Sequence, residues 1–229
     1  MKTNSETPDR IDFPPSVMLY PLPVVMVSCA GNQSDYEEDR ANIVTVAWAG
    51  TVCSDPPMIS ISLRKSRHSH RLISDTKELV VNLVSQSLVH SCDYCGVRSG
   101  QTEDKFASCH LTAVPASGLK HAPAILEAPI YLSCIVEKTI ELGSHDMFIA
   151  RIISVSVDQR IVGADGKIRI DNADLVTYVH GDYYSIGKML GFFGYSVASA
   201  DKLRKRMKNA IFVAKSTTKK ISKKKKPRK

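Results

Sequence analysis

The pattern of hydrophobic and polar residues along the chain predicts short β-strands. The clearest case lies between Met58 and Arg64, where Ile59, Ile61 and Leu63 alternate with serines. In a strand, such an alternation places successive side chains on opposite faces of the sheet. The pattern therefore predicts a strand with one buried face and one polar face.

The other predicted strands are apolar runs, and they lie at residues 22–29, 42–49, 78–84, 130–142 and 147–157. Helices are predicted over 67–76, 85–97 and 198–214, a loop-rich region over 98–129, and turns at 54–57, 143–146 and 164–167. Strands outnumber helices and follow one another in pairs. We therefore expect a mainly β fold, an antiparallel barrel with peripheral helices, rather than alternating β–α units.

The composition indicates one soluble globular domain with appendages. Of the 229 residues, 43% are hydrophobic and 24% are charged, so the chain can bury a core. No apolar run approaches the roughly 20 residues that span a bilayer, and the polar start of the chain lacks the apolar stretch of a secretory signal. Six cysteines, several of them in apolar runs, then indicate reduced thiols in a cytoplasmic protein without a membrane partner.

The positive charge is concentrated at the end of the chain. The formal net charge is +8, and residues 215–229 hold eight lysines, one arginine and no acidic residue. We expect a flexible lead at 1–15, a barrel domain at 16–197, a basic helix at 198–214 and a disordered lysine-rich tail at 215–229. This distribution argues against nucleic-acid binding except through the tail, because nucleic-acid readers usually carry basic residues on a folded face.

A candidate anion site lies where the serine-bearing strand ends. Ser66 is a favourable N-cap, so a helix is expected to begin at Arg67. Its first turn holds Arg67, His68 and His70, although cations there oppose the helix dipole. A bound phosphate would explain this arrangement, because backbone N–H groups, hydroxyls and arginines could converge on it; a solvated basic surface is the alternative. Neither a P-loop nor a Rossmann glycine motif is present, so the pattern does not indicate a nucleoside triphosphate or a Rossmann dinucleotide.

The cysteines offer a second candidate site. Cys92 and Cys95 form a Cys-x-x-Cys pair, with His90 before it and Cys109-His110 after it. Four ligands from this set could hold zinc, or the pair could act as redox thiols. Because one Cys-x-x-Cys pair without a second is a weak metal motif, we expect buried or loop thiols and no metal.

Several further motifs occur in one order along the chain. They are Asn42-Ile-Val-Thr-Val-Ala-Trp-Ala-Gly50, Ser54-Asp-Pro-Pro57, Ser60-Ile-Ser-Leu-Arg-Lys-Ser-Arg-His-Ser69, Val81-Asn-Leu83, Cys95-Gly96, Ser99-Gly100, Asp104-Lys-Phe106, Gly143-Ser-His-Asp-Met-Phe148, Asp182-Tyr-Tyr184 and Gly194-Tyr195. In this combination, the sequence from about residue 15 to residue 196 resembles the flavin reductase-like FMN-binding split barrels, and the flavoredoxins most closely. The resemblance implies a homodimeric FMN-binding split β-barrel, with FMN near the subunit interface.

The resemblance also implies which residues contact the cofactor. In the family, the strand that matches 45–48 lies along the flavin ring, and the serine strand and first helix hold the ribityl chain and the phosphate. The residues expected to bind the cofactor are Asn42, Thr45, Val46, Ala47, Trp48, Ser62, Arg64, Ser66, Arg67, Asn82 and Lys105. Backbone groups of such a strand can hydrogen-bond the flavin, which itself supplies the hydride chemistry. Ordinary strand and core roles are the alternatives for Thr45 and Trp48.

His145 is the candidate catalytic residue. It lies in the predicted turn, and its family match lies near the flavin, where it could orient a nicotinamide or hydrogen-bond the flavin. A solvent-facing turn histidine is the alternative. Tyr183 and Tyr184 could shelter the site, but neighbours in a strand point to opposite faces, so we expect at most one of them to do so.

Three functions stay open at this point. The first is an FMN-dependent oxidoreductase that uses NAD(P)H to reduce flavin or a small acceptor. The second is a non-catalytic electron carrier whose FMN exchanges electrons with a protein partner. The third is a nucleic-acid-binding module that uses the lysine-rich tail. The sequence contains no dedicated nicotinamide-nucleotide fingerprint, so the electron donor is open.

Overall fold

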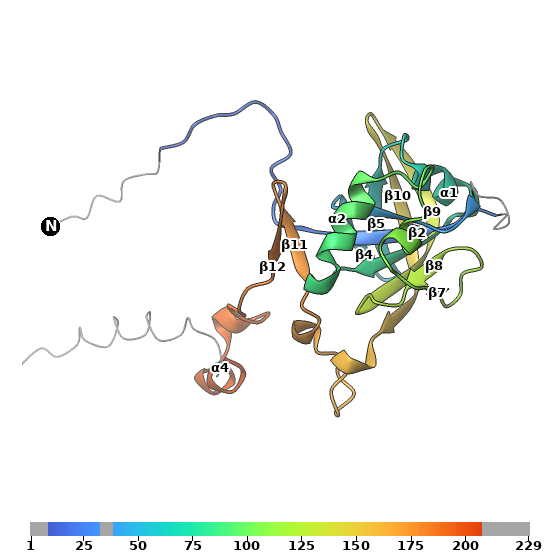
Figure 1. The fold of residues 1–229 in the computed structure, drawn as a ribbon. Coiled ribbons are helices and arrows are strands. Elements are labelled where there is room, and N and C mark those ends of the chain that lie inside the picture. The colour runs from blue at the N-terminus through green and yellow to red at the C-terminus, as the bar shows by residue number, and fades with distance from the viewer. Residues whose placement is uncertain (1–8, 33–38, 208–229) are drawn as a thin grey trace, which may run out of the picture. The chain divides into compact units, whose positions relative to one another are not determined.

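The computed structural model of the protein describes residues 9–32 and 39–207. The chain divides into two compact units at Ser185 and Ile186, and the first of them carries the sheets (Figure 1). The sequence had placed the end of the barrel domain at residue 197. The lysine-rich tail expected at 215–229 lies outside the described residues.

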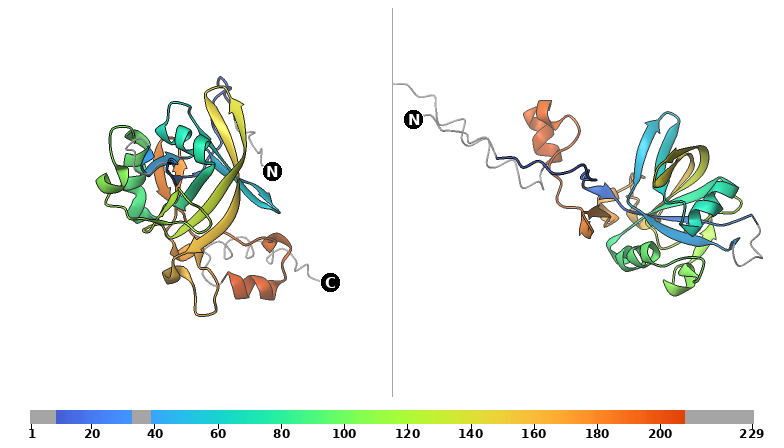
Figure 2. Two further views of the ribbon diagram at one scale, coloured as in Figure 1. Left: turned by 90° about the vertical axis from the view of Figure 1, so that its right-hand side faces the viewer. Right: turned by 90° about the horizontal axis from the view of Figure 1, so that it is seen from above.

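A seven-stranded antiparallel sheet forms the body of the first unit. Its strands follow the order β3-β2-β6-β9-β10-β5-β4, which makes β3 and β4 the outermost strands. The strands are β2 (Val25–Cys29), β3 (Asn42–Val46), β4 (Ala49–Ser54), β5 (Pro57–Leu63), β6 (Glu78–Leu83), β9 (Ile130–Leu142) and β10 (His145–Val157). Figure 2 shows β9 and β10, drawn in yellow, as a long hairpin along one side of the curled sheet. The expected mainly β barrel is confirmed.

Two smaller sheets complete the strands. One joins β1 (Leu22–Pro23), β11 (Val176–Val179) and β12 (Asp182–Ser185), and the other pairs β7 (Ala113–Pro115) with β8 (Pro123–Ile125). In the first sheet, the hydroxyl of Thr177 donates to the carbonyl of Leu22 at 2.7 Å. Strand pairing and this hydrogen bond therefore connect the start of the barrel unit with its end.

In the first unit the helices lie at the periphery of the sheet, as predicted. The described α-helices are α1 (His68–Thr76), α2 (Val89–Val97), α3 (Lys105–Ser108) and α4 (Ala200–Arg206), and the 3₁₀ turns are η2 (Gln86–Leu88), η3 (Gln159–Ile161), η4 (Ile170–Asn172) and η5 (Tyr195–Val197). In this part of the chain, no helix is long and apolar enough to cross a membrane. The basic helix expected over 198–214 is observed as α4, and positions 208–214 lie outside the described residues.

The core confirms the alternation read from the sequence. Ile59, Ile61 and Leu63 of β5 are buried inside the barrel, whereas the serines between them are only half-buried. A second apolar cluster lies between the sheet and the helices, where Met26 and Ile43 pack with Cys92, Cys95 and neighbouring residues. This second cluster fixes α2 beside β3, and it thereby builds one wall of the site described next.

Two local predictions are corrected. The strand expected over 42–49 ends at Val46, and a bend at Ala47 and Trp48 separates β3 from β4. His145 is the first residue of β10 and pairs with Leu142, so the hairpin turn is shorter than the sequence indicated. In both places the ladder partners decide where a strand ends, namely Val25 for Val46 and Leu142 for His145.

Candidate functional site

Two adjoining cavities lie between β3, β5 and α2. The first has a volume of about 360 Å³ and the second of about 250 Å³, and Val44, Arg64 and Arg67 line both of them. Ligand sites typically enclose roughly 300–1,000 Å³. The cavities are therefore large enough, taken together, for an extended cofactor.

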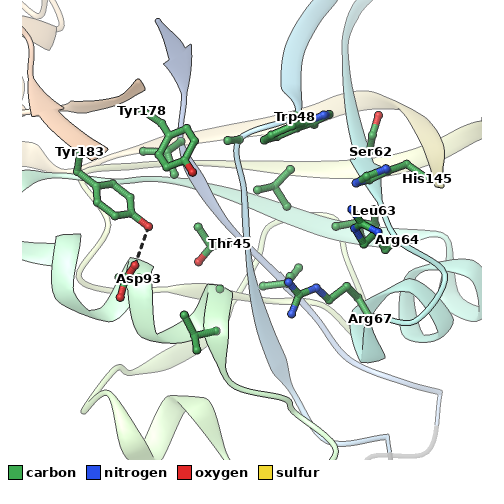
Figure 3. A pocket seen from close by; sticks show the side chains of 16 residues that line it. Thr45, Trp48, Ser62, Leu63, Arg64, Arg67, Asp93, His145, Tyr178 and Tyr183 are labelled. Carbon is green, nitrogen blue, oxygen red and sulfur yellow. Dashed lines mark hydrogen bonds between the residues drawn. The ribbon is translucent and has the colours of Figure 1, made fainter. Parts of the chain in front are cut away.

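Aromatic and polar side chains face each other across the first cavity, which we call the ring cavity. In Figure 3, Tyr178, Tyr183 and Asp93 lie on one side, Ser62, Arg64 and His145 lie on the other, and Thr45 lies between them. Val24, Val44 and Val46 add apolar surface. The cavity therefore combines apolar side chains with polar groups at its ends.

The floor of the ring cavity is the free edge of β3. This strand pairs with β2 on one side only, because it is outermost in the sheet. The pairing of β3 with β2 ends at Val46. Beyond it, the carbonyl of Trp48 accepts a hydrogen bond from the N–H of Ser62 in β5 at 2.8 Å. Backbone groups along such an edge need partners, so the floor can hydrogen-bond a planar heterocycle.

Helix α2 packs closely against this floor. The hydroxyl of Thr45 donates to the carbonyl of Cys92, and a Cβ placed on Gly96 would lie 3.2 Å from the Cβ of Thr45. Only glycine allows this approach without a shift of the threonine. Gly96 and Val97 consequently reach the ring cavity from the end of the helix.

Tyr183 closes one side of the ring cavity. Its hydroxyl donates to Oδ1 of Asp93 at 3.2 Å, and its ring meets that of Tyr178 edge-on at 5.6 Å between centroids. Burial, and then the neighbouring Cys92 and Asp93, raise the pKa of Tyr183, so the phenol stays protonated. Tyr184 is exposed and lines neither cavity. The expectation that at most one of the two tyrosines shelters the site is confirmed.

Trp48 and His145 form the opposite rim. Their rings are parallel within 2°, with centroids 6.3 Å apart, which is an offset stack. The hydroxyl of Ser144 lies 2.8 Å from Nδ1 of His145 and steadies the imidazole. Trp48 is 42% exposed, so this rim stays accessible to a second molecule.

The second cavity, which we call the anion cavity, is strongly cationic. It is lined by four basic residues, Arg64, Arg67, Arg98 and Lys105, and none of the described residues that line it is acidic. Residues 66–69 place the start of α1 at this cavity, and the first turn of α1 carries no acid. Helix dipole and side chains therefore both favour a bound anion. The helix begins at His68, one residue later than expected, with Arg67 as its N-cap.

Lys105 lies deep in the wall of the anion cavity. Its ammonium donates to the carbonyl of Ile43 at 2.7 Å and to that of Cys95 at 2.9 Å, and the residue is 3% exposed. Burial lowers the pKa of this lysine. Lys105 thus joins α3 to both β3 and α2 while it adds positive potential to the cavity.

Asn42 presents a buried acceptor that lacks a hydrogen bond. Its Nδ2 donates to Oγ of Ser69 at 2.8 Å, whereas Oδ1 has no hydrogen-bond partner among the described residues. A Cβ on Gly100 would lie only 2.1 Å from this oxygen. An unsatisfied buried acceptor costs about 1–3 kcal/mol, and a ligand hydroxyl would relieve that cost. The cavity therefore fits a phosphate ester on a hydroxyl-bearing chain.

An ion-pair network connects the elements that carry the two cavities. Nε2 of His70 in α1 lies 2.8 Å from Oδ2 of Asp146 in β10. Lys65 lies 3.6 Å from Oδ1 of the same aspartate and 2.7 Å from Oε2 of Glu141. Because Asp146 follows His145 directly, the contact between His70 and Asp146 connects the helix at the anion cavity with the strand that carries the histidine of the ring cavity.

The structure brings together most of the residues singled out from the sequence. The ring cavity is lined by Thr45, Val46, Ala47, Trp48, Ser62 and His145, the anion cavity by Asn42, Ser66 and Lys105, and both by Arg64 and Arg67. Sequence reasoning missed Asp93, Val97, Arg98 and Tyr178. No local pattern marks these residues, since they come from a helix and a strand that only tertiary packing brings to the site.

Asn82 requires a correction. It was expected to contact the cofactor, but it lines neither cavity and is fully buried. Its Nδ2 donates to the carbonyl of Met26 at 3.0 Å and to Oγ of Ser28 at 2.9 Å, and its Oδ1 accepts from the N–H of Ile125 at 2.9 Å. Asn82 therefore connects strands inside the protein.

The cysteines do not gather into a metal site. All six are free thiols. Within the described ranges 9–32 and 39–207, no three histidine, cysteine or acidic side chains lie close enough together to hold a metal ion. The zinc alternative that the Cys92–Cys95 pair raised therefore finds no ligand cluster in this part of the chain.

Comparison with known proteins adds a family assignment. The family model described as "Flavin reductase like domain" matches residues 17–187. The structure of a flavoredoxin from Desulfovibrio vulgaris (Miyazaki F) superposes with a TM-score of 0.75 and 32% identity, over 83% of this chain and 100% of that one. The reductase component of a 4-nitrophenol 4-monooxygenase/4-nitrocatechol 2-monooxygenase from Rhodococcus opacus is 27% identical over 67% of this chain and 76% of its own length. An uncharacterized protein of Archaeoglobus fulgidus is 30% identical over 52% of this chain, and the match spans 66% of that protein.

Proposed function

Because the chain belongs to the flavin reductase-like family, we propose that it binds FMN across the ring and anion cavities and passes electrons through it. The observation that carries this proposal is the junction of the two cavities at Arg64 and Arg67. A flat, apolar, aromatic-rimmed space continues there into a cationic one. FMN has the same polarity, with a planar ring at one end and a phosphate at the other.

The residues present fit each part of that cofactor. The free edge of β3 and the bend at Ala47 and Trp48 offer backbone groups to the polar edge of the ring. Oδ1 of Asn42 can accept from a hydroxyl of the connecting chain. Arg67, Arg98 and the start of α1 would hold the phosphate.

A bound flavin supplies the hydride and electron chemistry, and the residues of the chain bind it, orient it and limit water. Tyr183, kept as a phenol and joined to Asp93, covers one side of the ring cavity. His145 stacks on Trp48 at the other side, where it can orient an electron donor. The exposed face of Trp48 leaves room for that donor to approach.

We propose that the donor is NADH or NADPH, which makes the protein an FMN-dependent oxidoreductase. A second candidate is a non-catalytic electron carrier, whose flavin exchanges electrons with a redox protein. The similarity to a flavoredoxin favours the carrier, and the similarity to the reductase component of a monooxygenase favours the enzyme. The two share one cofactor site and differ in whether a nicotinamide reduces it in steady state.

We further propose that the protein acts as a homodimer in the cytoplasm. β4 is an outermost strand of the sheet, and both Val52 on it and Trp48 just before it are about half exposed. A second copy would cover both. Six free thiols are typical of a reducing compartment. Light scattering coupled to size-exclusion chromatography tests the dimer directly, and a monomer would refute it.

The absorbance spectrum of the purified protein, before and after addition of FMN, tests the cofactor assignment. Flavin bands that stay with the protein through gel filtration are the expected result, and their absence at saturating FMN would refute the proposal. NADH and NADPH are then added anaerobically, and bleaching of the flavin bands is measured. Bleaching and repeated turnover in air support the enzyme, whereas bound flavin that neither nucleotide reduces supports the carrier.

A further inference from the structure

We propose that Cys95 and Cys109 form a reversible disulfide in response to peroxide, and that this bond clamps the wall of the anion cavity over the cofactor phosphate. The clamp part of the proposal rests on the FMN site proposed above. The bond itself does not depend on that site. The pair is distinct from the Cys-x-x-Cys pair that the sequence suggests, because the partner of Cys95 lies 14 residues further along the chain.

The two sulfur atoms already lie next to each other. Their separation is 3.9 Å, so a bond of about 2.05 Å requires them to approach by roughly 1.9 Å, shared between two side chains. Cys95 belongs to α2, and Cys109 ends α3, where its N–H donates to the carbonyl of Lys105 at 3.1 Å. Both helices are already joined at this point, since Lys105 also donates to the carbonyl of Cys95.

The segment that the bond would enclose carries much of the cofactor site. Between Cys95 and Cys109 lie two residues of the ring cavity and four of the anion cavity, namely Gly96 and Val97, and Arg98, Ser99, Gly100 and Lys105. A disulfide restricts the freedom of the loop that it closes. It would therefore slow any opening of this wall, and with it the release of a phosphate held in the anion cavity.

The two thiols differ in a way that sets the order of reaction. Cys109 is partly exposed, whereas Cys95 is fully buried. Burial, and then the neighbouring Cys109, raise the pKa of Cys95, so its thiol stays protonated. An oxidant therefore meets Cys109 first, and Cys95 serves as the resolving thiol.

The chemistry balances with hydrogen peroxide as the oxidant. The sulfur of Cys109 attacks one peroxide oxygen, the O–O bond breaks, and the departing hydroxide takes the thiol proton to form water. The sulfur of Cys95 then attacks the sulfenic sulfur of Cys109. The S–S bond forms, and the hydroxyl leaves as a second water with the proton of Cys95. The two thiols lose two electrons, which the peroxide gains, and a dithiol reverses the reaction.

Cys92 provides a matched control. It lies one helical turn before Cys95 in α2 and is equally buried. Its carbonyl accepts from the hydroxyl of Thr45, and the backbone carbonyl is kept when the side chain is replaced by serine. A Cys92→Ser variant therefore leaves the proposed pair intact.

The test treats the FMN-loaded protein with hydrogen peroxide and maps its thiols by mass spectrometry after digestion without reductant. We expect a cross-linked Cys95–Cys109 peptide, loss of two of the six free thiols, and reversal by dithiothreitol. The Cys92→Ser variant should behave in the same way, and Cys95→Ser and Cys109→Ser should not cross-link. FMN release, followed by the recovery of flavin fluorescence on dilution, should be several-fold slower after oxidation in the wild type and in Cys92→Ser, and unchanged by oxidation in Cys95→Ser and Cys109→Ser.

A Cys92–Cys95 link, or a Cys109 that proceeds to sulfinic acid without a link, would overturn the proposal. A link that leaves the rate of FMN release unchanged would overturn the clamp. If either serine variant fails to fold, alkylation of the partly exposed Cys109 in the wild type has to block the link instead. Thiol mapping detects the cross-linked peptide whether or not FMN is bound. A protein that forms the Cys95–Cys109 link but binds no FMN would therefore contradict the proposed function and not the disulfide.

Discussion

Replacing Arg67 by alanine is the sharpest test of the cofactor site. Arg67 lines both cavities and forms the N-cap of the helix that faces the anion cavity. Arg67 is exposed, so the packing of the core does not depend on its side chain. The substitution should therefore weaken FMN binding and leave the folded state intact.

The magnitude follows from the contact that is lost. A hydrogen bond to a charged group contributes about 1.5–3 kcal/mol, which corresponds to a roughly 10- to 150-fold increase in the Kd for FMN. An Arg67→Lys variant keeps the charge but loses the planar fork, so its Kd should lie between those of the wild type and Arg67→Ala. Because the contact is electrostatic, the salt dependence of binding should also become weaker.

Fluorescence titration of FMN with the cofactor-free protein measures these constants. The control is Arg71→Ala, since Arg71 lies on the same helix but lines neither cavity. Its Nη1 instead lies 2.9 Å from Oδ1 of Asp39 and 3.4 Å from Oδ2 of Asp75. We expect the control to bind FMN as the wild type does. Equal Kd values for Arg67→Ala and Arg71→Ala would show that no anion is bound at the start of α1.

Three further predictions concern the residues around the site. Burial lowers the pKa of Lys105 in the folded protein below its ordinary 10.5. Between the folded and the unfolded pKa of this lysine the unfolded chain binds more protons, so the free energy of unfolding rises with pH. Urea denaturation at a series of alkaline pH values should show this rise in the wild type and not in Lys105→Met. Asn82→Ala should lower the free energy of unfolding by about 2–4 kcal/mol, because it leaves buried partners unpaired, and an altered Kd for FMN would contradict its purely structural role. Gly100→Ala should raise that Kd by about tenfold, because its Cβ would displace Oδ1 of Asn42 and disturb the bond to Ser69. Titration of Gly187→Ala, at a position with open space around it, provides the comparison.

The sequence predicted the elements whose signal is local. The alternation in β5 and the apolar runs of β9 and β10 depend on neighbours one or two residues away, so the faces of β5 could be read directly, and the three strands could be placed to within two residues at each end. The basic first turn of α1 likewise indicated an anion, because charges near a helix start act at short range.

Long-range packing set the features that the sequence did not predict. Asp93 and Tyr178 reach the ring cavity from elements that lie about 45 and 130 residues beyond the start of the floor strand, and no periodicity marks either residue. The same holds for Asn82, whose partners on Ser28 and Ile125 are visible only once the strands pair. The contact between Cys95 and Cys109 was hidden behind the more conspicuous Cys-x-x-Cys spacing.

The pairing of β1 with β11 has a consequence for protein synthesis. The strand that contains Leu22 has no partner until Thr177 and Tyr178 have been translated. Tyr183, which covers the ring cavity, is translated later still. The residues that line the anion cavity have all been translated once Lys105 has, but β5, which leads to Arg64 and Arg67, pairs only with β4 and β10 among the described strands, so the folded cavity also requires the later β10. At ribosomal rates of about 5–20 residues per second, Tyr183 follows Lys105 by some 4–16 s. We therefore expect the tyrosine that covers the ring cavity to be the last part of the site to be made.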